Sequence, residues 1–367
     1  MTIKNLSLEA HKKGIDLIGT GDCLNSGWLD EIKELNVIDE GTYEMNDTKF
    51  ILTTEVEDSS RVHHLLIFPG LAQAEEFRKK VKSKSKNIDS DGRPNLRMNG
   101  FEIAQLAKDL DTIIGPCHAF TPWTAMYAYH DSLESCYGDM ADHVSIIELG
   151  LSADTNLADR IAELERLTFL TNSDAHSPYP VRLAREFNRF EVEDITFDEI
   201  KKAILRQAGR GCVLNIGLPP QEGKYNESAC IKCFTHYTLQ QSVENKWKCT
   251  ECGKRIKKGV RDRVEELADY AIPRHPSYRP EYIHIIPLAE IIMKALGHSS
   301  TSTKGVTQVW GKLIERFGNE VNILVDADIA EIRKVTDKRI TRAIEAFRTN
   351  EIKIEPGGGG QYGKLVF

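Results

Sequence analysis

The sequence predicts an α/β fold for residues 1–215, followed by a small cysteine-containing module and a mainly helical region. In the first part, apolar stretches of strand length alternate with amphipathic stretches of helix length, as in proteins with a parallel sheet or barrel. Two close cysteine pairs follow between residues 230 and 252. From residue 261 onward, apolar residues recur at helical spacing. These observations divide the chain into residues 1–215, 216–260 and 261–367.

Six apolar stretches in the first part have the length and composition of strands. They span residues 15–20, 50–56, 62–68, 112–117, 144–149 and 167–172. Helices are predicted between them at 71–84, 100–110 and 157–167. A further helix at 195–207 begins with Thr196 or Asp198 as its cap. The polar segment 84–97, which contains Asp91-Gly92, is predicted to be an exposed loop.

The rest of the chain differs in character. Glycines and prolines at 217–223 predict a linker into the cysteine module. Helices are then predicted at 261–271, 287–296, 306–317, 327–335 and 338–347. A glycine run at 357–360 precedes a short apolar tail, and either its amides approach a phosphate or a base, or it is a flexible turn.

Length, charge and hydropathy limit the class of protein. At 367 residues and 41% hydrophobic composition, the chain is long enough for two or three domains with sizeable cores. The net charge of −7 argues against general adhesion to nucleic acid but allows a local basic face. We find no 18-residue apolar run and no signal-peptide pattern, and therefore expect a cytoplasmic protein without a membrane partner.

The two cysteine pairs have the spacing of a metal site. Cys230-x2-Cys233 and Cys249-x2-Cys252 are separated by fifteen residues. Four thiolates on two short knuckles form a closed tetrahedral site, which is typical of structural zinc. A redox dithiol, the alternative, needs only one pair.

Basic residues concentrate next to these cysteines, which predicts contact with nucleic acid. The candidates are Trp247, Lys248, Lys254, Arg255, Lys257 and Lys258. Lysine and arginine would contact phosphates, and Trp247 or Tyr237 could stack on a base. The alternative is a solvated face with the tryptophan in the core. Further along, Arg274 and Arg279 either line a DNA channel or belong to an ordinary interdomain loop.

Ligand-type residues lie at or near the ends of the predicted strands. They are Asp22, Glu55, His63, His64, His118, Glu148, Asp174 and His176. Because parallel α/β barrels carry their chemistry at strand ends, these side chains are expected to meet. Carboxylates with imidazoles suit Zn²⁺, Mn²⁺ or Fe²⁺, and clustered ions contact both the attacking and the leaving oxygen of a phosphoester.

Each candidate also has a structural interpretation. Asp22 could cap a helix, His118 could be structural, and Glu148 could pair with an arginine. His63 and His64 point to opposite faces of a strand, so only one of them can face a given site. We select His64, with His63 as the alternative. Arg182 and Arg185 follow the Asp174-Ala175-His176 stretch and either bind the scissile phosphate or are exposed helix arginines.

These motifs resemble those of the PHP (polymerase and histidinol phosphatase) domain. The pieces are Gly-Thr-Gly-Asp22, Thr-Glu55-Val, His63-His64-Leu-Leu, Gly-Pro-Cys-His118, Glu148-Leu-Gly and Ser-Asp174-Ala-His176-Ser. The cysteine module and the helical tail extend the resemblance over nearly the whole chain, to the endonuclease Q family.

The resemblance implies a distorted (β/α)7 barrel with a zinc-ribbon insert and a helical C-terminal domain. It implies metal-dependent nicking of DNA on the 5′ side of deaminated bases (uracil, hypoxanthine, xanthine) or at abasic sites. Zn²⁺, Mn²⁺ or Mg²⁺ would be held by the catalytic residues Asp22, Glu55, His64, His118, Asp174 and His176.

Two departures from the PHP pattern affect this expectation. The chain contains no His-x-His strand motif, and Cys23-Leu24-Asn25 stands where His-Pro is expected. We therefore expect the first barrel strand to be missing, with an unpaired strand edge and an incomplete metal site. A truncated or mis-started chain would explain both.

Two other functions fit parts of the sequence. A non-catalytic nucleic-acid-binding zinc protein fits the absent histidines, and a small-molecule phosphatase fits the barrel alone. Gln361 and Lys364 followed by Phe367 are only a weak match to a sliding-clamp peptide.

Overall fold

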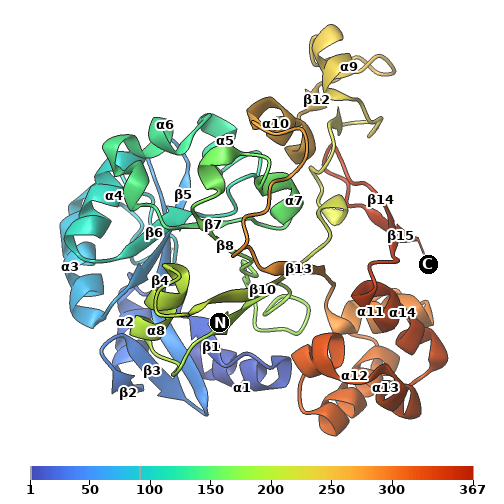
Figure 1. Cartoon of the computed structure of the whole chain (residues 1–367), viewed down its shortest axis with the longest axis horizontal. Helices are drawn as coiled ribbons and strands as arrows, with labels where there is room; N and C mark the ends of the chain where they lie inside the picture. Colours follow the sequence, from blue (N-terminus) through green and yellow to red (C-terminus); the bar gives the residue numbers. More distant parts are fainter. Residues whose placement is uncertain (1, 91, 367) are drawn as a thin grey trace.

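The computed structural model describes residues 2–90 and 92–366. It contains an α/β body, a cysteine module at one end and a group of C-terminal helices beside the body (Figure 1). Phe367, and with it the end of the clamp-like peptide, lies outside the described residues, as does Asp91.

The main sheet has six strands, in the order β2-β3-β4-β5-β6, with β1 attached to β4. The strands are β1 Leu17–Gly19, β2 Asn36–Asp39, β3 Thr42–Met45, β4 Thr48–Glu57, β5 His63–Phe68 and β6 Ile113–Pro116. The first half of β4 pairs with both β1 and β3, and its second half pairs with β5. One long strand therefore connects the two halves of the sheet.

The direction of pairing corrects the predicted parallel sheet. Neighbours from β2 through β6 pair antiparallel, and β1 pairs with β4 in parallel. The reason is the short link between β4 and β5, where Asp58 Oδ1 accepts hydrogen bonds from the amides of Ser60 and Val62, both 2.8 Å long. A parallel pair would need a long crossover in place of this turn. Farther along the chain, β7 Ile146–Glu148 and β8 Thr168–Leu170 do pair in parallel.

Helices lie on both faces of this sheet (Figure 1). Most pack on the face that carries Phe50 and Phe68, and the helix at 197–204 packs on the opposite face, against Ile51, Ile67 and Ile113. The helices are α1 Ile3–Lys13, α2 Ser26–Lys33, α3 Leu71–Val81, α4 Gly100–Asp109, α5 Met126–Tyr129, α6 Leu133–Tyr137, α7 Thr155–Ala158 and α8 Phe197–Ile204, with 3-10 turns η1 Lys82–Lys84, η2 Gly138–His143 and η3 Ala162–Leu164. Phe50, Phe68, Phe77 and Phe169 are fully or almost fully buried in the core between them. Asn25, which stands where the PHP pattern has His-Pro, caps α2 by accepting hydrogen bonds from the amides of Gly27 and Trp28.

The helix predicted at 157–167 is wrong as a continuous element. The chain forms only α7 and η3, and Ile161 between them has an extended backbone. Asp159, at the end of α7, is held by the guanidinium of Arg279 at 2.8 Å. This long-range ion pair fixes the local path in a way that helical periodicity does not show.

A second sheet links the body to later parts of the chain. It contains β9 Phe187–Glu191, β10 Gly211–Gly217 and β13 Glu281–His284, in the order β13-β10-β9. The boundary predicted at residue 215 falls inside β10. After the turn η4 Pro220–Glu222 come β11 Ala229–Cys230, α9 Leu239–Glu244, β12 Ile256–Lys257 and α10 Val260–Leu267. Val260 and Val264 of α10 pack into the main core.

The helical region has its own core. Its elements are α11 Leu288–Leu296, α12 Lys304–Phe317, the π-helical turn η5 Asn322–Asp326, α13 Ile329–Val335, α14 Lys338–Arg348 and the hairpin β14 Lys353–Glu355 with β15 Lys364–Val366. The helices predicted from residue 287 onward are confirmed. Ile292, Leu313 and Ile344 are completely buried among them. Over the part of the chain that is described, no helix is both long and apolar enough to cross a membrane.

Candidate metal centres and nucleic-acid interface

Glu55, His63 and His118 meet at one edge of the main sheet. β4 and β6 run toward this edge and β5 starts from it, which brings the three side chains together. Glu55 Oε1 lies 2.5 Å from His63 Nδ1 and 3.3 Å from His118 Nε2. The two imidazole nitrogens are 3.1 Å apart. One carboxylate oxygen and two ring nitrogens therefore converge on a single point.

The structure corrects our choice between the two adjacent histidines. His63 joins this cluster, whereas His64 points to the opposite face of β5 and contacts Tyr137 and Asp58. The alternation of side chains along a strand explains why one of them had to be excluded. The sequence alone did not say which, because the face depends on the register with β4.

A second carboxylate orients His63. Glu57 Oε2 lies 2.9 Å from Nε2 of His63, and Asn95 donates a 2.5 Å hydrogen bond to the other Glu57 oxygen. A carboxylate on the far nitrogen holds the ring and leaves Nδ1 for a metal, as in many metal-binding histidines. Sequence reasoning missed Glu57, although its place two residues after Glu55 puts it on the same face of the strand.

The loop predicted at 84–97 covers part of this edge. Arg93 approaches Glu55 Oε1 at 3.3 Å. The loop also lies close to Asp22: a Cβ on Gly92 would be 2.3 Å from Oδ1 of that residue. Asp22 is bridged to Thr54, the neighbour of Glu55. The loop thus brings a cation and a close backbone approach to the predicted metal-binding edge.

Glu148 and Asp174 lie near enough to act on the cluster electrostatically. Burial raises the pKa of Glu148 to about 8; the charge of His118 opposes this, and the charges of Glu55 and Asp174 add to it. Burial alone would lower the pKa of His118, but Glu55 raises it to about 9. Burial alone would raise the pKa of Glu55, but hydrogen bonds from His118 and His63 bring it well below its ordinary value.

Asp174 acts on the Glu55-His63-His118 cluster through its charge, and its side chain contacts that of His176. Their side chains contact each other at 3.2 Å, and the His176 side chain is 81% exposed. Arg185, a candidate for binding the scissile phosphate, instead donates hydrogen bonds to the backbone oxygens of Ser173 and Asp174. His118 and Gly150 pack closely, since a Cβ on Gly150, whose φ is +74°, would lie 2.8 Å from the His118 Cβ.

These residues fit a divalent metal. The donor atoms of Glu55, His63 and His118 all lie within 4.8 Å of one another. Within the described ranges 2–90 and 92–366, the buried Nδ1 of His118 has no hydrogen-bond partner. A cation here would relieve the repulsion among the carboxylates, which adds to the effect of burial on the pKa of Glu148. Imidazole with carboxylate suits zinc and manganese.

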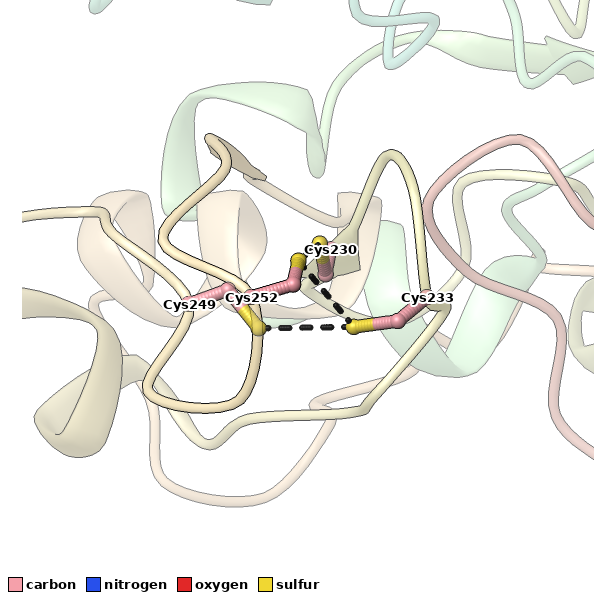
Figure 2. Close-up of side chains that lie close together, drawn as sticks. All are labelled: Cys230, Cys233, Cys249 and Cys252. Carbon is pink, nitrogen blue, oxygen red and sulfur yellow. Dashed lines mark hydrogen bonds between the residues drawn. The ribbon is translucent and has the colours of Figure 1, made fainter.

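The four cysteines form a second candidate metal site. Figure 2 shows their sulfur atoms pointing toward one another. The sulfurs of Cys230 and Cys252, and those of Cys233 and Cys249, are each 3.4 Å apart, and all four cysteines are free of disulfides. A hydrogen bond from Thr235 lowers the pKa of the Cys233 thiol to about 6, which favours the thiolate. Four such ligands suit a closed tetrahedral site.

Several of the basic residues proposed for DNA contact are available for it. Lys248, Lys254 and Arg255 are exposed on the cysteine module. Arg182 and Arg274 are also exposed, and Arg274 lies 4.0 Å over the ring of Tyr270. Trp247 packs against the core of the module, with Lys258 Nζ 5.0 Å from its ring. Lys258 is in addition paired with Glu266 at 2.5 Å, which neutralises part of its charge.

Two of the predicted DNA contacts are wrong. The Arg279 side chain is 2% exposed and is paired with Asp159 inside the protein. Lys257 is 9% exposed, its Nζ lies 3.2 Å from the ring centre of Trp123, and burial lowers its pKa to about 8. Tyr237 is buried as well and donates a hydrogen bond to the Cys249 sulfur. Composition alone does not separate such buried cations from surface ones.

Known proteins match most or all of the chain. Residues 287–351 match the family described as the MJ0043 C-terminal domain. Over 262 residues the chain is 47% identical to the uncharacterized protein MJ0043 of Methanocaldococcus jannaschii, covering 70% of this chain and 32% of that protein. The match thus spans about a third of the length of that relative. The uncharacterized protein YqxK of Bacillus subtilis is 30% identical over 380 residues, covering 100% of this chain and 92% of that protein.

Solved structures decide the family. The fold matches the lesion-specific endonuclease PfuEndoQ of Pyrococcus furiosus with a TM-score of 0.96 and 51% identity, covering 100% of this chain and 90% of that one. The chain belongs to the endonuclease Q family. A second endonuclease Q structure, a complex with a 27-mer duplex that has an abasic lesion at the active site, matches with a TM-score of 0.93 and 51% identity, covering 100% and 91%. The resemblance predicted from the motifs is confirmed, together with an endonuclease Q-like α/β fold that contains a cysteine cluster.

Proposed function

We propose that the chain is a metal-dependent DNA-repair endonuclease that nicks DNA on the 5′ side of deaminated bases or at abasic sites. The observation that carries this proposal is the convergence of Glu55, His63 and His118 at the sheet edge. The endonuclease Q structures at 51% identity support the same reaction. The proposal includes the fold of the first domain, which would be a PHP-type barrel closed by seven strands.

In this proposal the three side chains hold divalent metal ions, with Glu148 and Asp174 as further ligands. When bound, such ions stabilise the negative charge on the attacking and leaving oxygens of a phosphodiester. Glu57 keeps the His63 ring in place, and Arg185 fixes the backbone of the segment that carries Asp174. The cysteine site takes Zn²⁺ and serves as a structural support for the exposed cations around it.

Lesion choice follows from the cost of extruding a base. Cleavage beside one nucleotide requires the enzyme to recognise that nucleotide outside the stack, and extrusion costs least where pairing is already damaged. Lys248, Lys254 and Arg255 on the cysteine module, with Arg182 on the body, would contact the phosphate backbone. Such contacts position the duplex and carry no information about its sequence.

Three substrates distinguish the possible functions. A labelled duplex with one uracil or abasic site, the same duplex undamaged, and a small phosphate ester are each incubated with Mg²⁺, Mn²⁺ or Zn²⁺. We expect a nick only in the damaged duplex. Binding of the duplex without cleavage in any metal would indicate a nucleic-acid-binding protein, and phosphate release from the ester with an intact duplex would indicate a phosphatase.

A further inference from the structure

We propose that Asp58, His64 and Cys136 form an additional metal site that selects Zn²⁺. It lies on the face of β5 opposite His63. The donor atoms of the three side chains lie within 4.8 Å of one another. Their residues are 2%, 0% and 6% exposed, respectively. This site shares no ligand with the Glu55 cluster or with the four cysteines.

The distances fit metal ligands better than a hydrogen bond. His64 Nε2 lies 3.4 Å from Asp58 Oδ2, and in the described part of the chain this buried nitrogen has no hydrogen-bond partner. A good N–H···O bond is about 0.5 Å shorter. Two ligands that are each about 2.0 Å from a tetrahedral zinc ion lie about 3.3 Å apart. The observed gap is therefore the size that a shared ion requires.

The remaining polar atoms of Asp58 and His64 hold these ligands in position. Tyr137 Oη lies 2.8 Å from His64 Nδ1 and can keep that nitrogen protonated, which directs the Nε2 lone pair to the site. Asp58 uses Oδ1 for the amides of Ser60 and Val62 and leaves Oδ2 for the ion. The ligand set has the outer support that zinc sites usually have.

The site borders a cavity. A cavity of about 280 Å³ is lined by Asp58 and Cys136, with His130 and Ser135 on its wall. It shares Glu134 and Gly138 with a larger cavity of about 630 Å³. The charged residues that line the larger cavity are mostly acidic. They are Glu134, Asp139, Asp142, Glu163 and Glu165, with Arg166 as the opposing cation. Acidic surroundings favour a cation, and the cavity beside Asp58 and Cys136 leaves room for a fourth ligand.

The thiol selects the metal. A thiolate with an imidazole and a carboxylate suits Zn²⁺, whereas a soft thiolate is a poor ligand for the harder ions Mg²⁺ and Mn²⁺. If Asp58, His64 and Tyr137 were only a structural hydrogen-bonded group, Cys136 would take no part and its replacement by serine would change no metal content.

The number of zinc ions bound per full-length chain tests the proposal. The protein is stripped with a chelator, reloaded with Zn²⁺, freed of excess ion by gel filtration, and analysed by mass spectrometry for zinc per chain. We expect Cys136→Ser and His64→Gln each to bind one ion fewer than the wild type. Cys212→Ser, a partly buried cysteine outside these clusters, should bind the same number. Equal zinc content in the wild type and Cys136→Ser would overturn the proposal.

A second measurement guards against variants that fail to fold. Crystals of the zinc-loaded wild type, measured on both sides of the zinc absorption edge, should show an anomalous peak between Cys136 Sγ, His64 Nε2 and Asp58 Oδ2. After reloading with Mn²⁺ alone, this position should carry no manganese peak. Zinc peaks at the other clusters with none here would contradict the proposal.

Discussion

His63 Nδ1 and His118 Nε2 lie 3.1 Å apart, although 54 residues separate them in the chain. Antiparallel pairing of β5 with β6 creates this contact, because it places the start of one strand beside the end of the other. Two imidazole nitrogens at this distance, both facing Glu55, share either a proton or a metal ion. The proposed activity rests on the second of these arrangements.

Replacing Glu57 should weaken metal binding without removing a ligand. Glu57→Gln loses the charge that holds His63 Nε2, and such orienting residues typically account for roughly 10- to 100-fold in metal affinity or activity. We expect the Mn²⁺ concentration for half-maximal nicking to rise by that factor. Glu44→Gln, on the neighbouring strand β3, serves as the control and should leave this Mn²⁺ concentration unchanged. An unchanged metal requirement in Glu57→Gln would exclude the orienting role.

Replacing Arg279 should destabilise the fold. Its guanidinium pairs with Asp159, whose side chain is 0% exposed, so removal takes the arginine charge from a buried carboxylate and leaves it with the His275 ring, 2.7 Å from its Oδ2. Breaking such a pair costs about 3–5 kcal/mol in the free energy of unfolding, which urea denaturation can measure. Arg274→Ala, which removes an exposed arginine nearby, should change it by less than about 0.5 kcal/mol. Similar stability losses in both variants would argue against an internal role specific to Arg279.

Removing Lys254 and Arg255 together should weaken duplex binding through phosphate contacts. The slope of log affinity against log salt is negative, and each lost contact reduces its magnitude by about 0.9, so the double alanine variant should have a slope smaller in magnitude by about 1.8. Fluorescence anisotropy at several salt concentrations measures this slope. The matched control, Lys79→Ala with Lys80→Ala, removes two exposed lysines from α3, on the far side of the body (Figure 1). An equal effect in the control would mean that only net charge matters.

Glu186 should make the fold less stable as the pH rises. Burial raises the pKa of this carboxyl to about 8, and one of its oxygens accepts the amide of Leu218. An acid whose pKa is raised on folding makes its full contribution to the stability of the folded state below its unfolded pKa. That contribution is lost as the pH rises to the folded pKa of about 8. Thermal unfolding between pH 5 and pH 9 should show this loss in the wild type and a smaller one in Glu186→Gln. Parallel pH profiles of the two proteins would disprove the assignment.

The sequence predicted most elements and the cysteine cluster because these depend on local patterns. Apolar runs located β4, β5 and β6 to within two residues at each end, and the spacing of the cysteines implied their convergence. The selection of His63 over His64 depends on strand register, and the antiparallel pairing depends on the turn at Asp58. Burial of Arg279 and Lys257 depends on partners more than 100 residues away. Such long-range pairing leaves no local signal in the sequence.

The position of the nick in an end-labelled duplex tests the central claim most directly. With Mn²⁺ and a single abasic site, the wild type should release one fragment that ends immediately 5′ of the lesion. His63→Gln should lower the rate by more than about 100-fold, beyond the effect typical of residues that only orient a ligand, while His143→Gln should cleave like the wild type. A strand that stays intact with every divalent metal, or cleavage by His63→Gln at the wild-type rate, would contradict the account.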